Sequence, residues 1–166
     1  MRFQTLFATC CLLLHQQPLT AAEPRFGFQA ALAQPMVDLP DTAAVGLQLG
    51  GHGQWDFGSG HGLQARADLT LYGPKDDYTQ TSFGLAADYT FHPEQRPSRF
   101  YFLAGMSLLD YQLSLPGSSS SSSGLGFDLG VGYDVDRHLG YQMRFTTQSV
   151  DGLSLGSLNV GILYTF

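Results

Sequence analysis

Apolar and polar residues alternate with a period of two through most of this 166-residue chain. The pattern is plainest at residues 45–57, where Leu47, Leu49 and Trp55 hold odd positions while Gln48 and His52 hold even ones, and residues 63–71 repeat it. Because successive side chains of a β-strand point to opposite faces, this period predicts strands with one apolar and one polar face. We expect eight strands, at residues 25–33, 45–57, 63–71, 82–91, 100–115, 124–135, 141–148 and 158–166.

These strands have the number and length that a membrane barrel requires. A tilted strand crosses a bilayer in roughly 9–11 residues, and an even number of antiparallel strands returns both termini to one side. The expected fold class is therefore all-β: an eight-stranded antiparallel up-and-down transmembrane β-barrel, formed by residues 23–166. With periplasmic termini, the extracellular connections would be 41–44, 73–80, 116–123 and 150–152, and the periplasmic ones 58–62, 92–99 and 136–140.

Six consecutive serines, at positions 118–123, form the low-complexity tract of the chain. Such a run has no apolar surface with which to fold, so it is predicted to be a flexible, solvated loop tip. Together with residues 73–80, it is where a partner at the cell surface would bind. The sequence leaves the identity of that partner open.

The first 22 residues have the features of a cleaved signal peptide. Arg2 gives a minimal positive charge, residues 6–14 are apolar, and positions 20–22 hold small residues suited to cleavage. The apolar part is shorter than the about 20 residues that a membrane-spanning helix needs. Because Cys10 and Cys11 both lie in this segment, the mature chain would contain neither a disulfide nor a thiol site.

Composition agrees with a membrane barrel and narrows the classes of function. Charged residues make up 13% of the chain, against about 25% in a typical soluble domain. The net charge is −6, and loss of a signal peptide with one basic and no acidic residue makes it −7. The absence of a basic stripe argues against a nucleic-acid partner. The histidines are dispersed without ligand spacing, so we expect no metal and no cofactor.

The polar face of the strands would line the barrel interior and carries most of the charge. A barrel of eight strands encloses a space that side chains can fill, and buried charges require partners. We expect Asp88 near Arg66, and His52 opposite Asp68 or Arg66 depending on register. The favoured interpretation is a filled interior; the alternative is a narrow proton or ion path, or a gated pore. The predicted interior polar network is His52, Asp56, Arg66, Asp68, Asp88, Asp128 and Arg144.

Aromatic residues gather near the strand ends on the termini side. Amphipathic rings favour the interface between lipid and water, so outward aromatic residues at one height would form a girdle. At the opposite end, Tyr111 is the candidate for a second, thinner girdle. The girdle predicted on the termini side consists of Trp55, Phe57, Tyr89, Phe91, Tyr101, Tyr133 and Tyr141.

The chain ends on an aromatic residue preceded by apolar residues at alternate positions: Phe166, Tyr164, Ile162, Val160 and Leu158. With the strand pattern, this ending resembles the small eight-stranded outer-membrane barrels of the OmpA transmembrane domain and OmpX type. The resemblance covers nearly all of the mature chain. It implies that the ending acts as an assembly signal, recognised by the barrel-assembly machinery.

These observations favour a monomeric, non-catalytic barrel with a structural or surface-interaction role, surrounded by outer-membrane lipid and lipopolysaccharide. A narrow channel for ions or small solutes is the first alternative. An enzyme acting on lipid A is less favoured, because the interior has no serine beside His52 and Asp56, and the His-x-Ser pattern of deacylases does not occur. A soluble lipocalin-like barrel would need an apolar interior, which these charged faces contradict.

Overall fold

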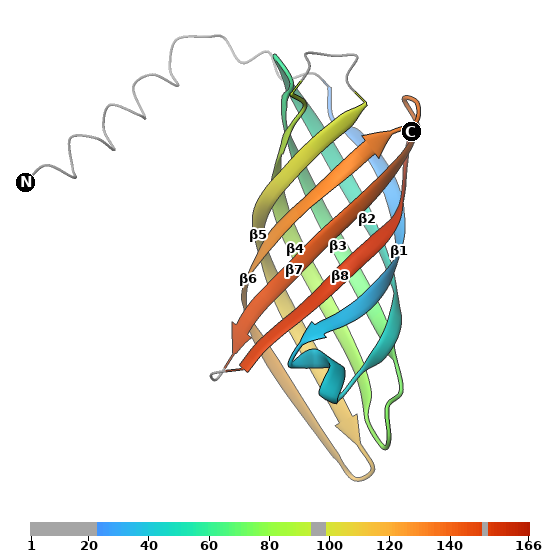
Figure 1. Ribbon diagram of the computed structural model, residues 1–166, viewed down its shortest axis with the longest axis vertical. Coiled ribbons are helices and arrows are strands. Elements are labelled where there is room, and N and C mark those ends of the chain that lie inside the picture. Colours follow the sequence, from blue (N-terminus) through green and yellow to red (C-terminus); the bar gives the residue numbers. More distant parts are fainter. Residues whose placement is uncertain (1–22, 94–98, 151–152) are drawn as a thin grey trace, which may run out of the picture.

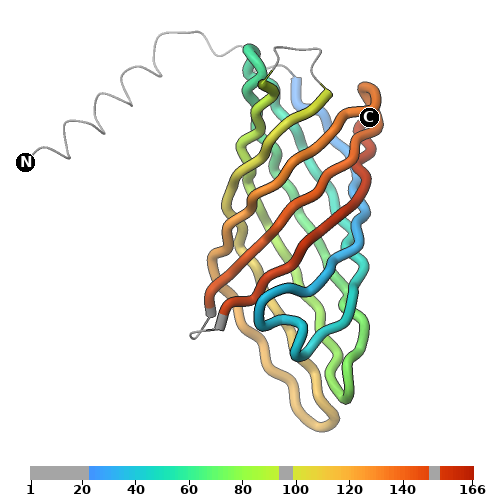
Figure 2. Tube along the Cα trace, viewed as in Figure 1, coloured from blue at the N-terminus to red at the C-terminus, as the bar shows by residue number. Residues whose placement is uncertain are grey.

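The computed structural model describes residues 23–93, 99–150 and 153–166, and these form a closed antiparallel barrel (Figures 1 and 2). Each strand pairs with its neighbours in the sequence, and β8 closes the barrel on β1. The expected fold class is confirmed. The strands are β1 Arg25–Val37, β2 Ala44–Gly58, β3 His61–Gly73, β4 Thr79–Phe91, β5 Phe100–Leu115, β6 Ser118–Asp134, β7 Leu139–Val150 and β8 Leu153–Thr165.

Both ends of the described chain lie at one end of the barrel, which we call the termini end; the opposite one is the far end (Figure 1). A short 3-10 helix, η1 (Leu39–Asp41), lies between β1 and β2 at the far end. Within the described ranges, no helix is long and apolar enough to span a membrane. The predicted signal peptide, residues 1–22, and the parts of the expected connections at 94–98 and 151–152 lie outside the described residues.

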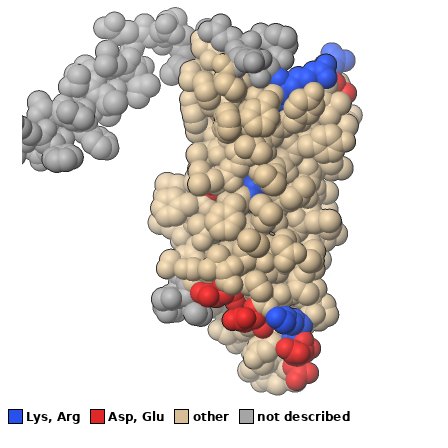
Figure 3. All heavy atoms as spheres, in the orientation of Figure 1, with Lys and Arg blue, Asp and Glu red and all other residues tan. Residues whose placement is uncertain are grey.

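The two faces of the barrel wall differ in polarity, as the alternation predicts. Outward side chains such as Phe28 and Leu129 are more than 60% exposed, which fits a wall that meets lipid instead of water. On the face shown in Figure 3, charged side chains gather at the two ends, and the band between them is almost entirely free of them. The outward girdle on the termini side is confirmed for Phe57, Tyr89, Tyr133 and Tyr141.

Two predicted girdle residues on β5 instead face the interior. Tyr101 is 3% exposed and Tyr111 is 4% exposed, whereas Phe102 and Leu108 of the same strand face outward. For Tyr101 the prediction was wrong because the first half of β5 is apolar on both faces, so its sequence does not show which face meets the lipid. Near Tyr111 the polarity is inverted: the strand leaves the band of apolar neighbours, and its apolar side chains turn towards the barrel axis.

The serine tract is a strand and not the predicted loop tip. Ser118–Ser123 opens β6 and pairs with β5, from Leu115↔Ser118 to Asp110↔Ser123. The connection is reduced to Pro116 and Gly117, and Gly117 has the positive φ of +87° that glycine adopts readily. The backbone of β5 supplies hydrogen bonds that do not depend on side chains, so a polar sequence extends the strand. This β5–β6 ribbon reaches farthest from the termini end (Figure 2).

Candidate functional site: the polar lumen and the far mouth

Arg66 is the centre of the polar cluster inside the barrel. Its side chain, on β3, points inward and contacts three carboxylates: Asp68 on its own strand, Asp88 on β4 with 3.0 Å from Nε to Oδ2, and Asp128 on β6 with 2.7 Å from Nη2 to Oδ2. All four side chains are buried. The planar guanidinium can bind several carboxylates at once because its five N–H groups point in fixed directions.

A second arginine, Arg144 on β7, extends this cluster across the lumen. Its Nη2 lies 3.6 Å from Asp68 Oδ2 and donates to Gln48 Oε1 at 2.9 Å, while Nη1 donates to Gln142 Oε1 at 2.7 Å. Gln142 in turn donates to Gln64 Oε1 at 3.0 Å. Side chains from β2, β3 and β7 are thus joined in one network of hydrogen bonds.

Of the seven residues that the sequence placed in the interior, the structure joins five in the cluster around Arg66 and Arg144, and it buries His52 in the same lumen. Asp88 lies beside Arg66, as expected, and His52 lies opposite Arg66 in the β2–β3 register. His52 is buried, with Nε2 3.2 Å from Thr165 Oγ1 on β8. Gln48, Gln64 and Gln142 also belong to this network, although the prediction named ionisable residues alone. Their places on the polar faces of the strands are the sequence signal for them.

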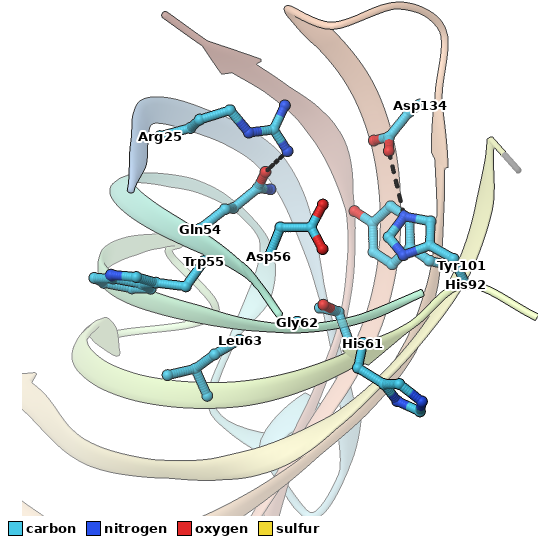
Figure 4. A pocket seen from close by; sticks show the side chains of 11 residues that line it. Arg25, Gln54, Trp55, Asp56, His61, Gly62, Leu63, His92, Tyr101 and Asp134 are labelled. Carbon is cyan, nitrogen blue, oxygen red and sulfur yellow. Dashed lines mark hydrogen bonds and ion pairs between the residues drawn. The ribbon is translucent and has the colours of Figure 1, made fainter. Parts of the chain in front are cut away.

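Asp56 is the predicted network residue that lies elsewhere. It is half-buried at the rim of the termini end, where its Oδ1 accepts a hydrogen bond from Gly58 N at 2.9 Å. Figure 4 shows it in a small rim pocket with Arg25, Gln54 and Tyr101. Asp56 lies only two residues before Gly58, the last residue of β2. Its side chain is therefore at the rim of the barrel, and not in the middle of the lumen with Arg66.

The rim pocket at the termini end is held by its own contacts. Arg25 Nη2 donates to Gln54 Oε1 at 3.2 Å, and His92 Nε2 lies 3.5 Å from Asp134 Oδ2 (Figure 4). The ring of His92 also packs on Tyr101, with 5.2 Å between ring centroids. The free space of this pocket is about 20 Å³, room for about one water molecule.

The lumen between the two ends is almost filled. Two cavities among the described residues adjoin the Arg66 and Arg144 side chains, and each has a volume of about 10 Å³. A cavity needs at least about 10–15 Å³ to hold one water molecule. Several buried polar atoms, among them His52 Nδ1, Ser107 Oγ and Asn159 Oδ1, have no hydrogen-bond partner among the described residues. Single waters at such atoms would complete the network without opening a path.

The far mouth is covered by the connection between β1 and β2. Leu39 of η1 is fully buried and packs in an apolar cluster with Tyr72 and Tyr111. Hydrogen bonds fix this connection to neighbouring elements: Lys75 Nζ donates to Pro40 O, and Thr42 Oγ1 lies 3.0 Å from Gln80 Oε1. Asp38 N also donates to Ser154 O of β8 at 3.2 Å. Residues 39–43 therefore form a plug over the mouth.

The predicted assembly signal forms a continuous row on the outer wall. Val160, Ile162, Tyr164 and Phe166 are about half exposed or more, with Phe166 at 64%; Leu158 is partly buried. The ring of Phe166 packs edge-on against Phe28, with 5.4 Å between centroids, and its N–H donates to Phe26 O at 2.9 Å. These two contacts hold Phe166 against β1, at the β1–β8 pairing that closes the barrel.

The turn between β6 and β7 supports the same end of β8. His138 Nδ1 lies 2.8 Å from Thr165 O, and Thr165 N donates to His138 O at 2.7 Å. Within that turn, Asp136 Oδ1 accepts hydrogen bonds from the N–H groups of His138 and Leu139 at 2.7 and 2.8 Å. These bonds favour the charged carboxylate and hold the pKa of Asp136 below its usual range.

The described part of the chain contains no group of side chains arranged as a metal site. No three histidine, cysteine, aspartate or glutamate side chains there are grouped to hold an ion. The three carboxylates of the lumen are instead paired with the two arginines. The arrangement can bind water and hold opposite walls together.

Comparison with known proteins gives one family and several structural relatives. The family model described as "Outer membrane protein beta-barrel domain" matches residues 6–166. No curated protein sequence matches the chain with significance. Seventeen solved chains match in structure, with low sequence identity among those compared below.

Three solved structures show the extent of the likeness. Neisserial surface protein A has a TM-score of 0.63 at 20% identity, covering 88% of this chain and 99% of that one. Ail, the attachment invasion locus protein of Yersinia pestis, has a TM-score of 0.57 at 18% identity, covering 86% and 97%. Its complex with the heparin analogue sucrose octasulfate gives 0.58 at 16% identity, again covering 86% and 97%. At these identities the likeness concerns the fold alone.

Proposed function

Because this chain belongs to the outer membrane protein β-barrel domain family, whose model matches residues 6–166, we propose that it is a closed, non-catalytic barrel that acts at the cell surface. The barrel anchors the protein in the outer membrane, surrounded by lipid and lipopolysaccharide. Its far end, with the β5–β6 ribbon and the plug, is the part that meets partners. The chain reaches the membrane by way of a cleaved signal peptide at residues 1–22, and its termini lie in the periplasm.

The observation that carries this proposal is the contact of Arg66 with three carboxylates in the middle of the lumen. Removing one partner from such a buried cluster leaves charges without compensation, which costs several kcal/mol. Opening a path would require that same disruption, so the cluster favours a closed barrel. If the barrel neither conducts nor catalyses, it acts through the surfaces that can contact other molecules. These surfaces are its two ends and its outer wall.

A narrow pore is the second candidate, and one observation favours it. Within the described part of the chain, polar atoms without a hydrogen-bond partner occur in the lumen on several strands, for example at His52 and Asn159, and waters bound to them could form a continuous chain. The volumes of the two lumen cavities, about 10 Å³ each, argue against that connection. The closed barrel is therefore the better-supported function.

The far end also suggests which partners are disfavoured. Its exposed or partly exposed charges at η1 and the β3–β4 turn are four aspartates, Asp38, Asp41, Asp76 and Asp77, against the single cation Lys75. An acidic surface repels polyanions. A sulfated ligand such as the one in the Ail complex is thus a poor match for this chain.

Single-cysteine labelling tests the surface role and the orientation together. Because both cysteines lie in the proposed signal peptide, Ser119→Cys in the ribbon and Arg137→Cys in the β6–β7 turn would each supply one thiol to the mature protein. A membrane-impermeant maleimide added to intact cells should label Ser119→Cys, and Arg137→Cys only after lysis. The reverse pattern would show that the proposed orientation is wrong.

Mass spectrometry of lipid A tests the non-catalytic part. Cells that express the protein and cells that lack it should give the same pattern of acyl chains. A species gained or lost only on expression would point to an enzyme.

A further inference from the structure

A cavity of about 450 Å³ opens at the far end, outside the filled lumen. It lies between η1, the projecting part of the β5–β6 ribbon and the start of β8. We call it the far cup. Its lining residues are Asp38, Asp41, Thr42, Gln80, Tyr111, Leu113, Ser120, Ser121, Ser122 and Leu155. Small-molecule sites usually have volumes of about 300–1,000 Å³, so the far cup has the size of one, unlike the spaces deeper in the barrel.

The register of the ribbon explains why the far cup exists. Tyr111 pairs with Ser122 and Leu113 with Ser120, so each pair points to one face, the one that lines the cavity. The large side chains come from β5 and the small ones from β6. In addition, among the described residues the β6–β7 pairing extends to Gly126↔Gln148, and no part of β7 pairs with the serines of β6. The cavity therefore exists because the serine side chains are small and because β7 does not pair with this part of β6.

The lining has an apolar part and an acidic part. Tyr111, Leu113 and Leu155 supply rings and methyl groups, with hydroxyls from Thr42 and the serines around them. The two charged residues of the lining are Asp38 and Asp41, both acidic. Asp38 Oδ2 accepts a hydrogen bond from Ser154 N at 2.8 Å, which holds that carboxylate at the rim.

The charges around the far cup strengthen its acidic character. Asp76 and Asp77 lie in the neighbouring β3–β4 turn, and Asp110 lies on the ribbon. The one nearby cation, Lys75, donates to Pro40 O in the plug and is absent from the lining. A concave surface lined by one sign of charge concentrates ions of the opposite sign. The far cup therefore attracts cations.

We propose that the far cup binds a small amphipathic cation: an ammonium group attached to an aryl or short alkyl body. The ammonium would lie at the rim beside Asp41 and Asp38, and the apolar body would pack on Leu113, Leu155 and the ring of Tyr111. A cation close to a tyrosine ring gains further stabilisation. Because the lumen beneath is filled, the ligand binds and does not pass. The proposed function determines only the side from which the ligand arrives; binding itself does not depend on it.

The test uses the folded full-length barrel in nanodiscs of zwitterionic lipid, which attract cations weakly. The probe is 2-phenylethylammonium, compared with 2-phenylethanol and 3-phenylpropionate, which have similar bodies but a neutral and a negative group. Binding is followed by amide chemical shifts in NMR spectra. The ammonium should shift amides of residues 38, 39, 41, 42, 120–122 and 155, since Pro40 has no N–H. The alcohol should bind about three- to tenfold more weakly, as expected for loss of contacts to two carboxylates, and the anion should not bind.

Two pairs of variants separate the far cup from the rest of the surface. Ser120→Trp fills the cavity and should abolish binding, whereas Ser119→Trp, on the other face of the same strand, should leave it unchanged. Asp41→Asn should weaken binding about two- to fivefold, as expected for an exposed ion pair, whereas Asp76→Asn in the neighbouring turn should change it less than twofold. A correctly folded Ser120→Trp variant that still binds would overturn the proposal.

Two further outcomes would also overturn it. Equal shifts with the alcohol would show that charge has no part in binding, and shifts confined to the lipid-facing wall would show simple partition into the membrane. Both are distinguishable from a failure of the proposed function, since conduction, enzymatic activity or the reverse orientation would leave binding in nanodiscs intact.

Discussion

Arg66 on β3 and Asp128 on β6 lie 2.7 Å apart, Nη2 to Oδ2, although their strands are separated by β4 and β5 in the barrel. The pair therefore joins walls that do not share backbone hydrogen bonds. With Asp68 and Asp88 on the same guanidinium, it gives this narrow barrel an ionic core in place of an apolar one. The outer wall provides the apolar surface.

Replacing Arg66 should destabilise the barrel severely. Arg66→Met keeps much of the side-chain volume but leaves Asp68, Asp88 and Asp128 without their shared cation, an effect of about 3–5 kcal/mol on the free energy of unfolding. Urea unfolding in lipid vesicles measures it. Arg99→Met, which removes an exposed arginine near the start of β5, should change the value by less than about 0.5 kcal/mol. Adding Asp128→Asn to Arg66→Met should recover part of the loss; no recovery would mean that uncompensated charge is not the cause.

A methyl group added beside this cluster should also destabilise the barrel. In Gly105→Ala on β5, the new Cβ would collide with Asp88 Oδ1 and the backbone of Ala87. Overpacking of this kind costs about 1–3 kcal/mol. Gly51→Ala on β2 is the matched control, because its nearest neighbour would be Gly27 O at an ordinary 3.7 Å. Equal melting temperatures for the two variants would show that the lumen around Asp88 is looser than the structure implies.

The outward row at the C-terminus should matter for assembly more than for stability. Phe166→Ala removes the terminal ring from Phe28 and shortens the proposed signal, so we expect less folded protein in the outer membrane. Phe127→Ala, which removes a ring of similar exposure from the middle of β6, should assemble nearly normally. Heat-modifiable mobility on gels of membrane fractions gives the folded amount. Normal levels of the Phe166→Ala protein would contradict the assembly role.

The plug depends on a single buried leucine. Leu39→Ala should loosen residues 39–43 while leaving the barrel folded, because Leu39 is the part of η1 that packs against Tyr72 and Tyr111. Hydrogen exchange of the Thr42 and Ala43 amides, which donate to Leu39 O at 3.2 and 3.1 Å, should speed up by about tenfold or more. The amides of β7 and β8 serve as the internal control. Unchanged exchange at Thr42 would show that the plug is held by Lys75 and Gln80 instead.

Most of the barrel could be predicted from the sequence because lipid outside and charge inside impose a strict period of two. Leu69 and Asp68 show this, because the leucine is stable facing the lipid and the aspartate is stable facing the lumen. The strand can therefore be oriented in one way only, and its register can shift only by an even number of residues. The same reasoning placed Asp88 beside Arg66. It failed on β5 for two reasons: around Tyr101 both faces are apolar, and at Tyr111 the apolar face is the one that points inward.

The far end could not be predicted, since there the strands no longer lie between lipid and a charged lumen. Ser118–Ser123 has no apolar period, and its strand depends on the β5 backbone, which a pattern of side chains does not reveal. Leu39 lies between two strands, where no alternating pattern indicates which side chains are buried. Its burial in the plug therefore could not be predicted. Asp56 was misplaced for a related reason: parity gives the face of a strand but not the distance from the rim.

Single-channel recording in planar bilayers tests the central claim, a closed lumen, most directly. The purified, folded wild-type protein should give no stepwise currents in 1 M KCl at moderate voltage, because the Arg66 cluster and the η1 plug leave room only for single waters. Insertion can be verified in the same preparation by protease protection of the barrel. Reproducible openings from inserted, folded wild-type protein would contradict the account and assign the protein to the pores.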